Sequence, residues 1–434
     1  MIFLLFLGVL SAIPDTFDEQ QKQAVLSNLV KGYKNAKVEY FGEHKGHGIV
    51  ATQDINVGEV IVADNSTVRH VSFEKYEWSP YFEGVYDKVK VVARLLYERL
   101  VNYKEAHSNL WAHTAPSEVP IIYNWTQSEI NYLDSLFNIK HRLFSPISYE
   151  KGRDLYFSCI TQIPNIEVVC PLCLTEEAWI WGIGTVLSRT FSTTKATWKY
   201  MQGIKPKEGD DDIEGSTFVP ALELLNHMPR PKTPNPNLGL EFTPSGYAVM
   251  RADRHFSKGD EIYWKYNFFD NIELLTYYGF VIDHNIDDRV YVYEEANGSC
   301  PENISKYTIE GKCTFGLNLY KINQVLLKYI ILLTDDKEVT GDIDLENFEL
   351  MNHSLREVLT KALFRYRKLN IYNSISRCKR NYLPAVKQVK KKTQSERQKL
   401  ADRFCLSTYW SFFQHLKTVD SSLIEVLSKT LELR

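Results

Sequence analysis

The order of local patterns along the chain is the feature that most restricts its fold. Residues 37–72 hold short β-rich runs separated by glycine, and such runs return at about 217–295. Between them, from about 73 to 187, apolar residues recur at the three- and four-residue spacing of amphipathic helices. The remainder, to Arg434, is again helical in pattern. This order predicts an α+β fold in which a domain of short, irregular sheets is interrupted by a helical insert and followed by an all-helical lobe.

Particular elements follow from the local patterns. Val91–Leu100 and Glu129–Leu136 have helical spacing. The residues Thr243–Gly246 are expected to join Gly239–Phe242 to Tyr247–Met250 as a β-hairpin, because proline, serine and glycine between two β-rich runs favour a tight reversal. The chain contains no internal repeat that we can detect.

Size and composition narrow the functional classes. With 434 residues, the chain is longer than one hydrophobic core usually supports, so we expect two or three structural units. Hydrophobic residues make up 44% and charged residues 24%, as in ordinary folded domains. The formal net charge of −3 offers no excess of basic residues to neutralise phosphates, so no direct nucleic-acid partner is expected.

The first twelve residues form an apolar run that ends in small residues. This run has about the length of the hydrophobic part of a secretory signal peptide, and it suggests secretory entry. The alternatives are the first helix of the folded domain or a wrongly assigned start. The run is shorter than the roughly 20 residues that span a bilayer. Because no later segment is long and uncharged enough, we expect no transmembrane segment in the mature chain.

The seven cysteines leave the redox compartment open. Cys300 and Cys313 flank a short polar loop and are suitably placed to pair in an oxidising lumen, while the odd total leaves at least one thiol over. Cys170 and Cys173 have the spacing of zinc ligands, but no second pair or nearby histidine accompanies them. No metal site is therefore expected.

Two segments about forty residues apart place polar groups among apolar neighbours. The first, Phe218–Pro229, contains Asn226 and His227, and the second, Glu261–Phe280, begins as a tyrosine-rich strand. Unpaired polar groups in apolar surroundings are costly, so these groups need partners. Taken alone, the Asn-His pair could equally cap a turn, and Tyr266 could be a core aromatic in a chain with 26 tyrosines.

Two earlier segments complete an ordered series of motifs. Gly46 and Gly48 lie on either side of His47, where a backbone without Cβ atoms can approach a ligand closely. The segment Val186–Phe191 comes next, before the Asn-His segment, the tyrosine strand and the closing Tyr278–Phe280. A series of motifs in this order resembles the SET-domain methyltransferases.

Within that family, the chain is most similar to the type of the Rubisco large-subunit lysine methyltransferase. Members of this type carry a helical insert inside the SET domain and a helical carboxy-terminal lobe that binds substrate. The tryptophan-containing stretch from Leu110 to Trp125 looks like the family's connection between insert helices. With the apolar run at the start, the resemblance divides the chain into five parts: a candidate signal peptide (1–12), a helical flank (13–36), the SET domain (37–285, with its insert at about 73–187), a linker (286–314) and the helical lobe (315–434).

The resemblance also implies a pseudoknot in which the carboxy-terminal SET segment threads under a loop. This threading would bring the Asn-His segment beside the tyrosine strand. S-adenosylmethionine would enter on one face and the substrate side chain through a narrow channel from the other. The two reactants would then meet in line, as methyl transfer requires.

Individual roles come from the same resemblance. Tyr266 would be the catalytic residue, whose hydroxyl orients the target amine. The cofactor-binding residues would be Gly46, His47, Gly48, Ser188, Glu223, Asn226 and His227. The substrate-binding residues would be Arg189, Phe191 and Tyr263. The expected cofactor is S-adenosyl-L-methionine, and the expected partner is a protein that presents a histone or non-histone lysine to a monomeric enzyme.

Two positions bear on activity and specificity. Phe191 matches an aromatic residue of the lysine-modifying members, and an apolar wall suits the methylene stem of lysine better than an imidazole. The segment Ala63–Asn65 stands where the family usually has Glu-x-Pro to hold the cofactor. Protein-lysine N-methylation is therefore the expected function. Two alternatives stay open: a catalytically degenerate SET scaffold that binds a partner protein, and a protein-histidine methyltransferase.

Overall fold

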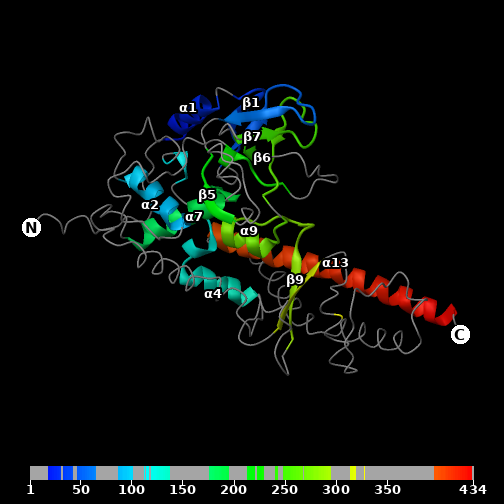
Figure 1. The fold of residues 1–434 in the computed structure, drawn as a ribbon. Helices are drawn as coiled ribbons and strands as arrows, with labels where there is room; N and C mark the ends of the chain where they lie inside the picture. The colour runs from blue at the N-terminus through cyan, green and yellow to red at the C-terminus, as the bar shows by residue number, and fades with distance from the viewer. Residues whose placement is uncertain are drawn as a thin grey trace, which may run out of the picture. The chain divides into compact units, whose positions relative to one another are not determined.

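The computed structural model shows a mixed chain of helices and short strands (Figure 1). It describes residues 18–30, 33–42, 46–64, 87–100, 112, 114–116, 119–136, 175–194, 213–219, 222–228, 240–242, 248–266, 268–294, 313–318, 327 and 395–432. The expected signal peptide, Cys300, and the cysteines at 170 and 173 lie outside these residues. The chain divides into two compact units, which are described separately below. The first comprises Met1–Asn124, Ile147–Asn267 and Thr276–Gly279, and the second comprises Trp125–Pro146, Phe268–Leu275 and Phe280–Arg434.

The first unit begins with helix α1 (Glu19–Leu29), which lies in the expected helical flank. Asp18 caps this helix by accepting a hydrogen bond from the backbone of Gln21, and the Gln21 side chain accepts from the backbone of Asp18 in return. Leu26 and Val30 are buried in the same apolar cluster as the strands that follow. The capped helix is thus held to the β part of the unit by hydrophobic packing.

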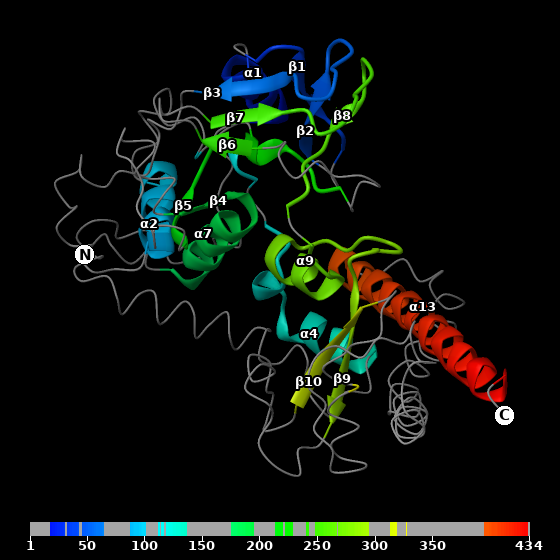
Figure 2. The ribbon, with the colours of Figure 1, turned by 45° about the vertical axis from the view of Figure 1, so that its right-hand side comes forward.

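Among the described residues of this unit, the strands form three small antiparallel sheets (Figure 2). Their strand orders are β1-β2-β8, β3-β7-β6 and β4-β5. The strands are β1 (Ala36–Tyr40), β2 (His47–Ala51), β3 (Val60–Asp64), β4 (Phe191–Thr194), β5 (Ile213–Thr217), β6 (Leu240–Phe242), β7 (Ala248–Arg251) and β8 (Glu261–Ile262). The pairing of β6 with β7, with Phe242 opposite Ala248, confirms the predicted hairpin.

One apolar cluster lies beneath these strands and extends to the Asn-His segment. Ile49 on β2 and Ile262 on β8 are fully buried in it. The same cluster contains Leu222 and Leu224 of the 3₁₀ helix η7 (Leu222–Leu224), together with Leu225. Burial of these leucines fixes the backbone immediately before Asn226, so the polar pair is presented from a rigid support.

The helical insert contributes a second apolar cluster to this unit. It is built around helices α2 (Asp87–Leu100) and α7 (Glu176–Arg189), which pack against each other. A Cβ on Gly182 would lie 2.9 Å from a methyl group of Val92, so the glycine allows the two helices their close approach. The 3₁₀ helix η5 (Ile122–Asn124) packs against this cluster through partly buried Tyr123. The structure therefore confirms the helix predicted at Val91–Leu100.

The second unit contains helix α4 (Gln127–Leu136), the first residues of α9 (Asn271–Tyr278), and the long helix α13 (Glu396–Glu432). It also contains the antiparallel strands β9 (Arg289–Glu294) and β10 (Cys313–Asn318). The predicted helix at Glu129–Leu136 is confirmed. The stretch expected as a linker, 286–314, includes β9 and the start of β10, and β10 continues four residues into the expected helical lobe.

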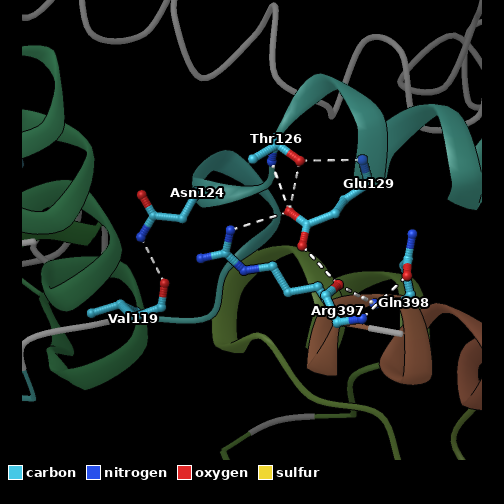
Figure 3. Close-up of polar contacts among 7 residues, drawn as sticks. Val119, Asn124, Thr126, Glu129, Arg397 and Gln398 are labelled. Carbon is cyan, nitrogen blue, oxygen red and sulfur yellow. Dashed lines mark hydrogen bonds and ion pairs between the residues drawn. The ribbon is translucent and has the colours of Figure 1, made fainter. Parts of the chain in front are cut away.

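Helix α4 is joined to the start of α13 by one carboxylate (Figure 3). Glu129 accepts hydrogen bonds from the backbone and hydroxyl of Thr126 at 2.9 and 3.0 Å, which cap α4. The same carboxylate accepts from Ser395 at 2.9 Å and pairs with Arg397 at 3.3 Å. Burial alone would raise the pKa of Glu129, but these hydrogen bonds and the Arg397 charge lower it by more.

A buried polar network also holds α13 to the segment after α9. Asp288 accepts hydrogen bonds from the backbone of Asn271 at 2.9 Å and from the Ser411 hydroxyl at 2.5 Å. The Asn271 amide also donates to Ser407 at 2.7 Å, and its oxygen accepts from the backbone of Ile282. Burial raises the pKa of Asp288 to about 7, although the Asn271 and Ser411 hydrogen bonds act in the opposite direction.

None of the helices among the described residues is long and apolar enough to span a bilayer. Within the same part of the chain, no cluster of three or more histidine, cysteine, aspartate or glutamate side chains is arranged to hold a metal ion.

Candidate active site

The Asn-His segment and the tyrosine strand lie side by side in the first unit. His227 and Trp264 form a parallel β-bridge. The Trp264 amide donates to the carbonyl of Asn226 at 2.9 Å, and the Met228 amide donates to the carbonyl of Trp264 at 3.3 Å. Two segments about forty residues apart in sequence therefore meet through their backbones, as the family resemblance implied.

Hydrogen bonds to the Asn-His segment hold both the backbone and the hydroxyl of Tyr266. Its backbone amide donates to His227 Nδ1 at 3.1 Å, and its hydroxyl donates to the carbonyl of Leu225 at 2.7 Å. The Tyr266 ring lies 5.1 Å from the His227 ring and 4.8 Å from that of Tyr278. Burial raises the pKa of Tyr266 well above its ordinary value, although the positive charge of Arg189 acts to lower it. The hydroxyl therefore stays protonated and can donate a hydrogen bond.

The glycine segment lies directly against the Asn226 side chain. A Cβ built on Gly48 would fall 2.8 Å from the Phe41 ring, 3.0 Å from Asn226 Nδ2 and 3.1 Å from Glu261 Oε1. Gly46 has a φ of 66°, in the left-handed region that favours glycine. The ring of His47 lies instead beside Tyr40, 5.1 Å away. Gly48 therefore packs directly against the Asn226 side chain.

Helix α7 ends at the predicted Ser-Arg pair. The Ser188 hydroxyl donates to the carbonyl of Gly184 at 2.7 Å, so it serves its own helix. Arg189 Nη1 lies 3.7 Å from Glu223 Oε2, which makes an ion pair longer than a hydrogen bond. Burial raises the pKa of Glu223 to about 7, and the Arg189 charge opposes that rise. Phe191, two residues on, packs against the apolar cluster of the sheets.

Sequence reasoning missed one acidic residue at the centre of this arrangement. Glu261, the first residue of β8, accepts hydrogen bonds from Asn226 Nδ2 at 2.7 Å and from the Tyr263 hydroxyl at 2.6 Å. The available signal was a glutamate two positions before Tyr263, on the same face of the strand. Sequence reasoning also did not foresee that His227 would serve Tyr266 through its Nδ1 atom.

The groups gathered here are suited to positively charged or hydrogen-bond-donating ligands. Carbonyl oxygens, carboxylates and phenol oxygens are acceptors or negative charges, and a partly dry site strengthens their attraction for a cation. The carboxylates are Glu223 and Glu261, the carbonyl is that of Leu225, and the phenols are Tyr263 and Tyr266. Arg189 supplies a positive charge beside Glu223, which is 2% exposed.

Fold and site together define a SET domain, and the sequence confirms it. The family model for the SET domain matches residues 46–267, just over half of the chain, so the protein belongs to the SET-domain family. The match begins at the first glycine of the glycine segment and ends directly after Tyr266. No curated protein sequence matches this chain.

Solved structures support the same fold. The chain is similar to the SET domain of LSMT bound to lysine and AdoHcy, with a TM-score of 0.63 and 16% identity over 94% of this chain and 93% of that one. It is also similar to Rubisco LSMT bound to sinefungin and monomethyllysine, with a TM-score of 0.62 and 15% identity over 93% of each chain. At these identities, the likeness establishes the α+β SET architecture with its helical additions.

Proposed function

We propose that this protein is an S-adenosylmethionine-dependent protein-lysine N-methyltransferase. The observation that carries the proposal is the placement of Tyr266, whose hydroxyl and backbone are both held by the Asn-His segment. Membership of the SET-domain family supports methyl transfer as the reaction class. The similar structures support the ligands, since one is described as Rubisco LSMT bound to AdoMet and others as bound to lysine or monomethyllysine.

The residues of the site fit S-adenosylmethionine. The absence of a Cβ on Gly48 lets the Asn226 side chain pack directly on the glycine backbone, which keeps the glycine segment and Asn226 together for binding the cofactor. Acceptor groups dominate the site, which matches a ligand that carries a sulfonium and an ammonium group. Asn226, Gly48 and the neighbouring Gly46 would hold the cofactor. When bound, it supplies a methyl group that becomes bonded to the substrate nitrogen as its bond to sulfur breaks.

The chain's own groups would prepare the substrate amine. An ammonium group must lose its proton before its nitrogen has a lone pair with which to attack. Arg189 places a positive charge near the reacting centre, and such a charge lowers the pKa of a neighbouring lysine. The Tyr266 oxygen, whose proton is directed to the Leu225 carbonyl, can accept a hydrogen bond from the amine and orient it.

Phe191 supports lysine as the target. It lies at the start of β4, opposite Thr217, and packs on the apolar cluster, so it can line a channel for a methylene stem. An imidazole would find no hydrogen-bond partner in its phenyl ring. The substrate in this proposal is therefore a lysine of a protein partner, and the enzyme acts as a monomer.

Titration calorimetry and a methylation assay test the proposal together. Purified protein is titrated with S-adenosylmethionine and then incubated with radiolabelled cofactor and an array of lysine and histidine peptides. Tyr266→Phe should remove most of the label transfer while leaving the cofactor Kd nearly unchanged. Tyr40→Phe, on an exposed strand residue, is the matched control and should behave as wild type.

The outcomes separate the competing functions. Failure of the wild type to bind the cofactor would favour a degenerate scaffold. The replacement of the family's Glu-x-Pro motif by Ala63–Asn65 is the sequence feature that supports this alternative. Label on histidine peptides alone would identify a histidine methyltransferase. Undiminished transfer by Tyr266→Phe would remove Tyr266 from the catalytic role.

A further inference from the structure

We infer that Glu261 is a positioning residue that fixes which way the Asn226 amide faces, and thereby selects a hydrogen-bond donor on the bound cofactor. The inference rests on the proposed function, and it deepens that function by naming the residue that controls recognition of the cofactor's amino-acid end. Glu261 does not need to touch the cofactor for this role. It acts through Asn226.

The direction of the hydrogen bond carries the inference. A carboxylate accepts hydrogen bonds and does not donate them, so an amide next to it must turn its NH₂ group toward it. Asn226 Nδ2 lies 2.7 Å from Glu261 Oε1, at ordinary hydrogen-bond length. The amide oxygen Oδ1 therefore points away from Glu261. Within the described part of the chain, no hydrogen bond to Oδ1 is formed, which leaves it to accept from a ligand.

The second oxygen of the same carboxylate keeps Glu261 in place. Tyr263 donates its hydroxyl proton to Oε2 at 2.6 Å. The backbone of Glu261 is held by strand pairing, with its Cα opposite that of Val50 on β2. Because both oxygens and the backbone are fixed, the carboxylate has little freedom to release Asn226 and let the amide flip.

Gly48 shows that this arrangement is closely fitted. Its missing Cβ would lie 3.0 Å from Asn226 Nδ2 and 3.1 Å from Glu261 Oε1, so the hydrogen-bonded pair packs directly on the glycine backbone. Glycine thus leaves room for the pair itself. The same close approach holds the Asn226 side chain against the glycine segment, so the amide has little room to turn.

Exchange of the two polar groups tests the inference. In Glu261→Gln, the new amide can donate as well as accept, so the orientation of Asn226 is no longer dictated. The Kd for S-adenosylmethionine should rise about tenfold or more, as expected when a hydrogen bond to a charged group is lost. Binding of 5′-methylthioadenosine, which lacks the amino-acid moiety, should stay within about twofold of wild type, because the effect is local to that moiety.

The double variant provides the rescue. Asn226→Asp alone places two carboxylates together and should weaken binding. When it is combined with Glu261→Gln, the new carboxylate can accept from the new amide, so an acceptor again faces the cofactor. This double variant should bind S-adenosylmethionine clearly more tightly than either single variant. Glu39→Gln, on an exposed strand position, is the matched control.

Each outcome bears on one conclusion. The positioning role would be overturned if Glu261→Gln bound S-adenosylmethionine with unchanged affinity. It would also be overturned if the variant lost equal affinity for S-adenosylmethionine and 5′-methylthioadenosine. Absence of rescue in a double variant with wild-type thermal stability would have the same meaning. Should Glu261→Gln fail to fold, the comparison of Asn226→Asp with the double variant still decides the matter. Absence of cofactor binding by the wild type would instead overturn the proposed function, and this inference with it.

Discussion

Asp288 in the second unit provides a direct test of the polar network described above. Its ordinary pKa is 3.8, and burial raises this to about 7 in the folded protein. A raised pKa in the folded state means that the protonated form is the one that folding favours. The resulting stabilisation is complete below about pH 3.8 and is lost as the pH rises through about 7.

The size of the effect follows from the difference between the two pKa values. Each pH unit corresponds to about 1.4 kcal/mol, so ionised Asp288 lowers the unfolding free energy by about 4 kcal/mol above pH 7. Asp288→Asn removes this dependence but loses about 1 kcal/mol, because an amide NH₂ cannot accept as the carboxylate does. We expect the variant to be less stable than wild type at pH 4 and more stable, by about 3 kcal/mol, at pH 8.

Urea denaturation followed by circular dichroism at intervals between pH 4 and pH 8 measures this crossing. The pKa of Glu223 is also raised to about 7, but that residue is common to both proteins and cancels in the difference. Asp283→Asn is the matched control, since its side chain is 65% exposed and pairs with Arg403 at the surface. Parallel stability curves for wild type and Asp288→Asn would refute the reasoning.

Four other substitutions have defined outcomes. Gly48→Ala should weaken S-adenosylmethionine binding about tenfold in calorimetry, because its Cβ would displace the Asn226 amide; wild-type affinity would contradict this. Gly279→Ala should lower the unfolding free energy by more than about 2 kcal/mol in urea denaturation, because it combines a φ of +74° with a Cβ 2.4 Å from the Pro120 backbone. Gly58→Ala, at a φ of +86° with open space around it, should cost less in the same measurement, and equal costs would exclude the steric contribution. Glu129→Gln should remove a stabilisation that wild type holds above about pH 4.5 and loses as the pH falls, as urea titrations at pH 3 to 6 would show; an unchanged pH profile would count against it.

Regular patterns explain which parts of the fold could be predicted. The helix at Val91–Leu100 has apolar residues at three- and four-residue spacing, and the hairpin at β6 and β7 has clear turn residues, so both follow from local physics. Strands β9 and β10 are separated by a polar stretch, and the local pattern of that stretch indicates a linker. The pairing of the two strands across it cannot be predicted from local pattern.

The site shows the same division between local and tertiary information. The family resemblance implied that the Asn-His segment and the tyrosine strand would meet, and the bridge between His227 and Trp264 confirms that they do. Ser188 and Glu261 could not be predicted in detail. The Ser188 hydroxyl is directed into its own helix, and Glu261 gains its place from the pairing of β8 with β2, which only the tertiary structure reveals.

The junction of Gly48, Asn226 and Glu261 has a consequence for how the protein folds. Its three members come from positions spread over more than two hundred residues, and the contacts of Gly48 with Asn226 and Glu261 each close a long loop of chain. Contacts of this kind form slowly, because loop closure costs entropy before any interaction rewards it. The cofactor site should therefore be among the last parts of the first unit to assemble on folding, and ligand binding should report completed folding more faithfully than helix content does.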